Sequence, residues 1–275
     1  MPHIFSDGTG LDFAVLGAHR VRNTQTPVYA RQGRGLVAPT AIKGGLTLET
    51  AKNGGSACGA LPRAMLGRAR SSLLAALLSA LNYRYADADG FELFLDIDSG
   101  VLARPSFVEK AIAGLDDRDL PLEKLVCFIH ADMPLDARRL RALALLAAAG
   151  ARLGVDNLFA CDNLPAALRH VAPSVIRLDD AWLRKLGASP PGRRLLASFV
   201  ASCHDEGWRV MAQDLRSFDR VRFAYDLGCD LFQGDALAGT TLMGSHIHVS
   251  PRNTLAMGER TADIVPFPAP RRLAG

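Results

Sequence analysis

Short apolar runs alternate with longer amphipathic segments along most of the chain. After the first third of the sequence, such runs predict strands at 91–97, 125–129, 152–155, 175–178, 208–212 and 230–232. Between these runs, apolar residues recur at helical spacing and predict helices at 105–115, 135–149, 164–170, 181–206 and 217–227. A Pro190-Pro191-Gly192 sequence interrupts the helix predicted at 181–206. Strands that alternate with helices along a chain form parallel βαβ units.

The first third of the sequence has a different pattern. Residues 1–24 are rich in glycine and polar residues, and two short strands are predicted after them, at 25–29 and 35–42. The glycine-rich stretch 44–59 predicts a loop. Leucines at helical spacing then predict a strong helix over 62–85.

Six strands joined by helices, with two more near the N-terminus, predict a single closed α/β barrel of the TIM-like (β/α)8 type. Such a barrel commonly takes about 250 residues, and this chain has 275. No change in composition indicates a second domain. We divide the chain into an N-terminal extension with the first strand region (1–24), the barrel (25–245) and a C-terminal arm (246–275). The arm begins with His246 and His248, which alternate on a predicted strand and so face one side, and it ends in a Pro-rich tail.

The composition is that of a soluble globular protein, with 49% hydrophobic and 22% charged residues. The formal net charge is +4, and the basic residues are scattered along predicted helices, which is typical of solvated faces and not of nucleic-acid binding. No apolar run approaches the length of about 18 residues that a membrane span requires, and the N-terminus lacks the pattern of a signal peptide. The five cysteines lack CxxC spacing, as expected for reduced thiols in a cytoplasmic protein.

Polar residues follow two neighbouring predicted strands where each strand ends. The strand at 152–155 runs into Asp156-Asn157, and the strand at 175–178 contains Arg177 and runs into Asp179. The carboxyl ends of the strands of a parallel barrel carry the functional residues. These residues therefore form the first part of a candidate site.

The same segment, GARLGVDNLFACDNLPAALRHVAPSVIRLDD, resembles the EAL-domain family, the cyclic di-GMP phosphodiesterases. That family has a strand ending in DDFGTG, a helix, and a strand reading LKID, where this chain has DNLFAC and IRLD. The GCDLFQG stretch at 228–234 is also similar, and the likeness covers roughly residues 20–240. The resemblance implies a vestigial ligand pocket formed by Lys43, Asp96, Asp156, Asn157, Arg177, Asp179, Gln213 and Gln233.

Several positions at which the family has acidic residues are altered in this chain. The family's signature glutamate falls on Thr40, and the glutamates of a later strand fall on Phe128 and Ala131. The family's hydrolysis resembles a two-metal mechanism, in which several carboxylates hold hard cations that activate water. Of the six aligned positions that bear on cation binding, which are Thr40, Asp96, Phe128, Asp156, Asn157 and Gln213, only Asp96 and Asp156 carry carboxylates. We therefore predict no catalytic residue and no metal site, with neither magnesium nor calcium as a cofactor.

The resemblance implies a catalytically inactive regulatory protein that acts through an unidentified protein partner, in the control of motility or surface attachment, and that can pair as a homodimer. The first alternative is a receptor that binds cyclic di-GMP without cleaving it, because arginine at position 177 suits a clamp on phosphate or carboxylate. The second is a residual metal-dependent phosphodiesterase that uses Asp96 and Asp156. A plainer interpretation is also open for Asp156 and Asp179, because aspartate at a strand end often caps the following helix or turn.

Overall fold

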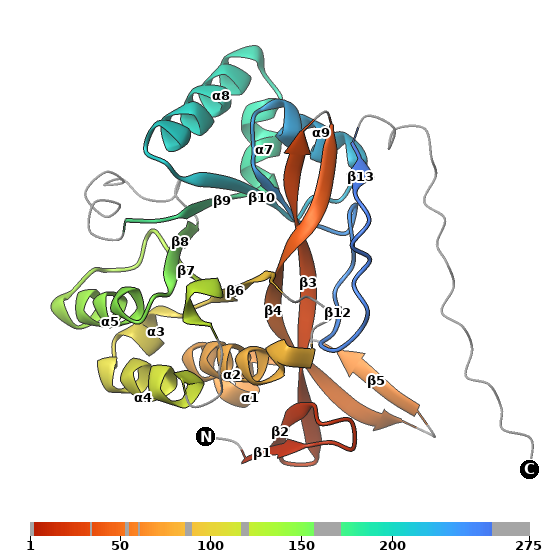
Figure 1. The fold of residues 1–275 in the computed structure, drawn as a ribbon, viewed down its shortest axis with the longest axis vertical. Helices are drawn as coiled ribbons and strands as arrows, with labels where there is room; N and C mark the ends of the chain where they lie inside the picture. The colour runs from red at the N-terminus through yellow and green to blue at the C-terminus, as the bar shows by residue number, and fades with distance from the viewer. Residues whose placement is uncertain are drawn as a thin grey trace, which may run out of the picture.

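The computed structural model describes residues 3–33, 35–52, 55–59, 61–85, 90–116, 121–156 and 172–254. Within them, eight strands close a barrel in the order β3–β11–β10–β9–β8–β7–β6–β4, with β4 pairing back to β3 (Figure 1). The strands are β3 (His19–Gly33), β4 (Leu36–Lys52), β6 (Glu92–Asp96), β7 (Leu125–His130), β8 (Arg152–Asp156), β9 (Val175–Asp179), β10 (Arg209–Gln213) and β11 (Leu231–Phe232). The predicted TIM-like barrel is confirmed.

One strand departs from the all-parallel pattern of a (β/α)8 barrel. β3 is antiparallel to both of its neighbours, β4 and β11, whereas the pairs from β4 round to β11 are parallel. A hairpin and not a helix leads from β3 into β4, with Gly33 and Gly35 at φ values of 80° and 78°. Only antiparallel strands can be joined by so tight a turn, because a parallel pair needs a long crossover.

Helices cover the outside of the parallel strands. They are α1 (Arg63–Leu66), α2 (Arg68–Asn82), α3 (Ser99–Leu102), α4 (Pro105–Asp116), α5 (Ala137–Ala148), α7 (Asp180–Gly187), α8 (Pro190–Asp205) and α9 (Phe218–Asp226), with 3-10 turns at Tyr83–Tyr85 and Leu122–Lys124. The helix predicted at 181–206 is two helices, because Ser189 caps a new helix whose first turn contains Pro190. The helix predicted at 164–170 lies outside the described residues. None of the helices in the described ranges is both long and apolar enough to cross a membrane.

The loop predicted at 44–59 is wrong. β4 continues to Lys52, and β5 (Gly55–Gly59) pairs back along it. The glycines at 44 and 45 serve packing: a Cβ at Gly44 would lie 2.2 Å from Ser79 Oγ on α2, and one at Gly45 would lie 2.8 Å from Thr24 Oγ1.

The N-terminal residues also form strands. β1 (His3–Ser6) and β2 (Asp12–Leu16) make a hairpin that pairs with β3, and β3 itself runs through the predicted boundary at residue 24. The resulting antiparallel sheet extends beyond the barrel. One of its faces packs on α2 through a buried cluster of Ala14, Val21, Leu74 and Leu78.

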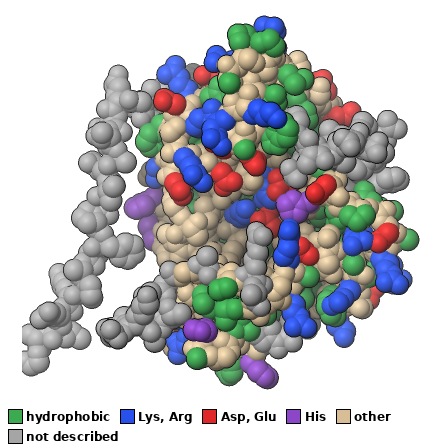
Figure 2. All heavy atoms as spheres, turned by 180° about the vertical axis from the view of Figure 1, so that it is seen from behind, with side chains coloured by type: hydrophobic (Ala, Val, Ile, Leu, Met, Phe, Trp, Pro, Cys, Tyr) green, Lys and Arg blue, Asp and Glu red, His purple; other side chains and the backbone are tan. Residues whose placement is uncertain are grey.

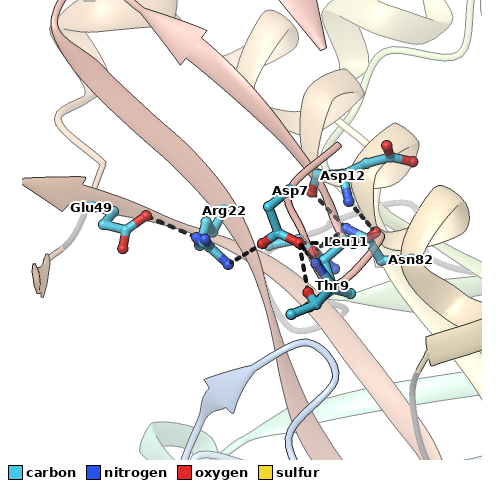
Figure 3. A network of polar contacts seen from close by, with 8 residues as sticks. Asp7, Thr9, Leu11, Asp12, Arg22, Glu49 and Asn82 are labelled. Carbon is cyan, nitrogen blue, oxygen red and sulfur yellow. Dashed lines mark hydrogen bonds and ion pairs between the residues drawn. The ribbon is translucent and has the colours of Figure 1, made fainter. Parts of the chain in front are cut away.

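Polar contacts fasten this hairpin to the rest of the fold (Figure 3). Arg22 on β3 pairs with Asp7 at 3.1 Å and with Glu49 on β4 at 2.8 Å. Asn82, at the end of α2, accepts a hydrogen bond from the Asp12 backbone N–H and donates one to the Asp12 carbonyl, at 2.7 and 2.8 Å. Polar contacts as well as apolar packing therefore join the sheet extension to the barrel and to α2.

The C-terminal segment covers the outside of the β3–β4 hairpin. β12 (Thr241–Leu242) pairs with β3, and β13 (Arg252–Asn253) pairs with β4 farther along (Figure 1). Between the two, Met243 and Ile247 are buried in the same apolar cluster as Tyr29 and Ile42. The residues around His246 and His248 form no strand, contrary to our prediction, and the two rings meet edge to face with their centroids 5.3 Å apart.

Alternation along the strands gives the barrel interior its layers. An apolar layer includes Phe94, Val175, Met211 and Leu231. Because side chains alternate across a strand, the residue two positions on from each of these points into the barrel mouth at the carboxyl end. At the opposite end, Glu92 pairs with Arg209 at 3.0 Å and with Arg152 at 2.6 Å.

Candidate functional site

The barrel mouth collects polar side chains from the ends of β6 and β8 and from positions within β4 and β9. A pocket of about 440 Å³ opens beside them, between the barrel and α2. Its lining includes Arg68, Ser72, Asp96, His130, Asp156 and Arg177. Figure 2, which views the molecule from behind, shows basic, acidic and histidine side chains gathered around a hollow near the middle of that face.

Arg177 lies at the centre of the mouth and joins two carboxylates. Its Nη1 donates to Asp96 Oδ1 and its Nη2 donates to Asp156 Oδ2, both at 2.7 Å. The side chain is only 3% exposed. Hydrogen bonds between two ionised groups are stronger than neutral ones, and the planar guanidinium fixes their directions. The predicted site residues on β6, β8 and β9 are therefore brought together by Arg177.

An aromatic platform supports the guanidinium. The centre of the Arg177 guanidinium lies 4.2 Å from the centroid of the Phe128 ring, which is a cation–π contact. Phe128 lies over Gly154 on the next strand, where a Cβ would come within 2.6 Å of the ring. A second ring, Phe94, contacts Phe128 with the centroids 5.3 Å apart. Phe128 thus fills the space beneath Arg177, and Gly154 leaves room for it.

Lys43 extends the ion pairs into a chain. Its Nζ lies 3.0 Å from Asp96 Oδ2, the oxygen that Arg177 does not bind. Burial alone would raise the pKa of Asp96, but the positive charges of Arg177 and Lys43 outweigh it and lower the pKa to about 2. Burial likewise opposes the charge of Arg177, and the two carboxylates reverse that effect and raise its pKa. The four side chains Lys43, Asp96, Arg177 and Asp156 are called the mouth chain below.

Two residues that sequence reasoning missed fasten the end of β6 to α2. Ser72 Oγ donates to the Asp96 carbonyl and accepts from the Asp98 N–H, both at 2.9 Å. Asp98 caps α3 through the Gly100 N–H and pairs with Arg68 at 3.3 Å. The Asp-Ser-Gly sequence at 98–100 is a typical capping signal, but nothing in the sequence places Ser72 beside it.

The remaining predicted site residues are not members of the mouth chain, and one of them is not described. Asp179 caps α7 and accepts from the Ala181 N–H, as the plainer interpretation had it. Gln213 and Gln233 are buried at the ends of their strands, and Gln233 Oε1 has no hydrogen-bond partner among the described residues. Asn157 lies outside the described residues. Thr40 falls at a register shift between β3 and β4, and Ala131 is buried.

The nucleophile and metal-ligand chemistry of the described residues is limited. Burial raises the pKa of the thiols Cys127, Cys203 and Cys229 to about 12, which keeps them protonated. Within the described ranges, no three His, Cys, Asp or Glu side chains converge as metal ligands would. His130 Nδ1 lies 3.9 Å from Asp156 Oδ2.

A family model described as the EAL domain matches residues 59–240. The chain belongs to the EAL domain family. The match confirms the resemblance seen in the sequence. It begins after β3 and β4, so Lys43 lies outside the matched residues. No curated protein matches the chain by sequence.

Solved structures of EAL proteins share the fold. Klebsiella pneumoniae BlrP1, in a manganese and cyclic di-GMP complex, has 17% identity and a TM-score of 0.69 over 89% of this chain and 60% of that chain. Bacillus subtilis YkuI, in complex with cyclic di-GMP and calcium, has 15% identity and a TM-score of 0.64 over 83% of this chain and 56% of that chain. The EAL domain of Mycobacterium smegmatis DcpA has 13% identity and a TM-score of 0.65 over 82% of this chain and 94% of that chain. This chain therefore spans less than two thirds of the BlrP1 and YkuI chains.

Proposed function

We propose that this EAL domain does not hydrolyse cyclic di-GMP and acts as a regulatory protein by binding a protein partner. The observation that carries the proposal is Arg177, which occupies the space between Asp96 and Asp156 and hydrogen-bonds both. Metal-dependent hydrolysis in this fold would need those two carboxylates as cation ligands. The proposal includes a cytoplasmic location, pairing as a homodimer, and a role in motility or surface attachment.

The donor set at the mouth fits a divalent cation poorly. Hard cations take six or more oxygens, several of them anionic. Asp96 is already neutralised by Arg177 and Lys43, and Phe128 offers no lone pair at the end of β7. A cation would have to displace a buried guanidinium whose hydrogen bonds to charged partners are worth about 1.5–3 kcal/mol each. No hydrolytic step is therefore assigned to these residues.

A second candidate is a receptor that binds cyclic di-GMP without cleaving it. The pocket of about 440 Å³ beside the mouth favours it, because Arg68, Ser71 and Ser72 line that pocket with hydrogen-bond donors. The charge around the pocket weighs against it: Asp96, Asp98 and Asp156 balance Arg68, Arg177 and the neighbouring Lys43. A ligand with two phosphates would meet no surplus of positive charge here. We therefore rank this function second.

The experiment is incubation of the purified protein with cyclic di-GMP, with and without manganese or magnesium, followed by chromatography for the linear dinucleotide and by calorimetric titration. We expect no linear product and no heat of binding. Product formation that requires metal would refute the loss of hydrolysis. Binding without cleavage, abolished by Arg68→Ala, would replace the first candidate with the second.

Partner binding is tested with variants at the barrel mouth and on the surface helices once a partner is isolated. Asp156→Asn and Arg177→Met should leave the affinity for that partner unchanged, whereas charge reversal on exposed helices should weaken it. The opposite pattern would assign partner binding to the barrel mouth.

A further inference from the structure

A second hollow lies between the amino-terminal parts of α4 and α5. It has a volume of about 600 Å³, and its lining includes Arg104, Ser106, Glu109, Arg138 and Arg141. Among the described residues, it shares no lining residue with the pocket beside the barrel mouth. Figure 1 shows α3, α4 and α5 together on one side of the barrel. This hollow is called the α4–α5 groove below.

The α4–α5 groove has a surplus of positive charge, because three arginines and one carboxylate line its described part. The carboxylate, Glu109, pairs with Arg141 at 3.2 Å. Arg104 and Arg138 are exposed and have no ion-pair partner among the described residues. The neighbouring Asp136 caps α5 and pairs with Arg139. Two arginines of the groove therefore remain able to bind an anion.

The positions of these two arginines oppose the usual electrostatics of a helix. Arg104 directly precedes Pro105, the first residue of α4, and Arg138 is the second residue of α5. The amino end of a helix carries partial positive charge, which favours acidic side chains and disfavours basic ones. Neither helix has an acidic residue in its first turn. Residues that break such a local rule occur mainly at functional sites.

An exposed aromatic ring lies beside the groove. Phe107, in the first turn of α4, is 37% exposed, and the Arg104 guanidinium lies 5.3 Å from the centroid of its ring. Arginine and aromatic residues are enriched in protein–protein interfaces, and the planar guanidinium suits carboxylates. The Glu109 carboxylate would repel the continuous phosphate backbone of a nucleic acid, whereas it can accept hydrogen bonds from the N–H groups of a peptide. The surface therefore suits an acidic peptide better than a nucleic acid.

We propose that the α4–α5 groove docks an acidic segment of the protein partner. Carboxylates of that segment bind Arg104 and Arg138, and one of its apolar side chains packs on Phe107. The inference rests on the proposed function, because it assigns a surface to the partner binding proposed above. It adds the location of the interface and the charge of the partner segment, and it leaves Arg177 out of the interface.

The test measures fluorescence anisotropy of a fluorescein-labelled, glutamate-rich peptide with one phenylalanine, titrated with the full chain. It is run at ionic strengths of about 0.01 M and 0.15 M, where the screening length is about 30 Å and 8 Å. Arg104→Glu with Arg138→Glu reverses the two charges, and both positions suit an acidic residue, so this variant should fold. Arg194→Glu with Arg222→Glu is the matched control, because it makes the same change in net charge at exposed residues of α8 and α9. Glutamine at positions 104 and 138 provides a milder variant should the reversal fail to fold.

We expect the wild type and the control to bind the peptide with affinities within about twofold of each other. The reversal of Arg104 and Arg138 should weaken binding by about tenfold, and the higher ionic strength should weaken binding by the wild type. Equal weakening in the two double variants would assign binding to net charge and overturn the inference. Absence of peptide binding by the wild type at the lower ionic strength would also overturn it.

Two further arms separate this inference from its alternatives. A labelled single-stranded RNA that binds through Arg104 and Arg138 more tightly than the peptide would overturn the choice of a protein segment. Loss of peptide binding in Arg177→Met would place the peptide at the barrel mouth and overturn the choice of groove. None of these titrations uses cyclic di-GMP, so a failure here would leave the proposed loss of hydrolysis standing, and finding hydrolysis would not alter these results.

Discussion

We expect the ion pairs of the mouth chain to contribute to the free energy of unfolding in a pH-dependent way, and one substitution measures that contribution. Asp96→Asn replaces the carboxylate shared by Arg177 and Lys43 with a neutral amide of nearly the same shape. In the folded protein the pKa of Asp96 is about 2, against 3.8 for the free side chain. The charged form is therefore favoured by folding, and its contribution is fully present above the unfolded value.

The size of this stabilisation follows from the pKa of Asp96 and from the exposed fraction of its side chain. A pKa held at about 2 in place of 3.8 corresponds to roughly 2 kcal/mol if nothing screens the charges. Because 48% of the Asp96 side chain is exposed, solvent screens the ion pairs, and we expect about 1 kcal/mol at neutral pH. The contribution should fade as the pH falls from about 4 towards 2, where the carboxyl group becomes protonated in the folded state too.

The assay is urea unfolding of the wild type and Asp96→Asn across this pH range, with Asp132→Asn as the control at an exposed carboxylate just after β7. The difference in unfolding free energy between wild type and Asp96→Asn should shrink towards zero in acid. A difference that stays constant between neutral and acid pH would show that the Asp96 ion pairs do not stabilise the fold. The control should show little difference throughout.

Three further substitutions test the packing around the site. Gly154→Ala should destabilise the protein by about 1–3 kcal/mol in urea unfolding, because the new methyl group meets the Phe128 ring at 2.6 Å; equal stability would mean that the ring moves freely. Ile247→Ala should cost about 2–4 kcal/mol in the same assay, because Ile247 is buried against the outside of the hairpin, and a cost below 1 kcal/mol would contradict that packing. Asn82→Ala should cost about 2 kcal/mol and should speed amide exchange at Asp12, because the Asp12 N–H loses its hydrogen bond to Asn82; unchanged exchange would refute this role for Asn82.

The parallel part of the barrel is predictable from sequence because each strand is a short apolar run bounded by a helix. The hairpin β3–β4 and its extension are not, because the glycines at 44 and 45 indicate a loop when only the local sequence is considered. In the fold they lie within β4, where Ser79 and Thr24 approach too closely for any side chain. That need arises from contacts between residues distant in sequence, which a local pattern cannot reveal.

The sequence likewise predicts the central residues of the candidate site but not the contacts that support them. Asp96, Asp156 and Arg177 are predicted by the ends of strands and by the family resemblance. The alternation of side chains along the strands points all three into the same barrel mouth, where they contact one another. The platform beneath them depends on register: Phe128 on β7 lies opposite Gly154 on β8. Ser72 reaches the end of β6 from a helix formed earlier in the chain. Neither relation has a signature in the linear sequence.

The residues at this mouth depend on one another. The Arg177 guanidinium stacks over the Phe128 ring, and that ring fits only because Gly154 has no side chain. The second oxygen of Asp96 is paired with Lys43. Arg177→Lys alone would leave Phe128 in β7, without a carboxylate to add to a cation site. The arrangement around Arg177 is therefore distributed over β4, β6, β7, β8 and β9, and building a cation site here would require coordinated changes on several strands.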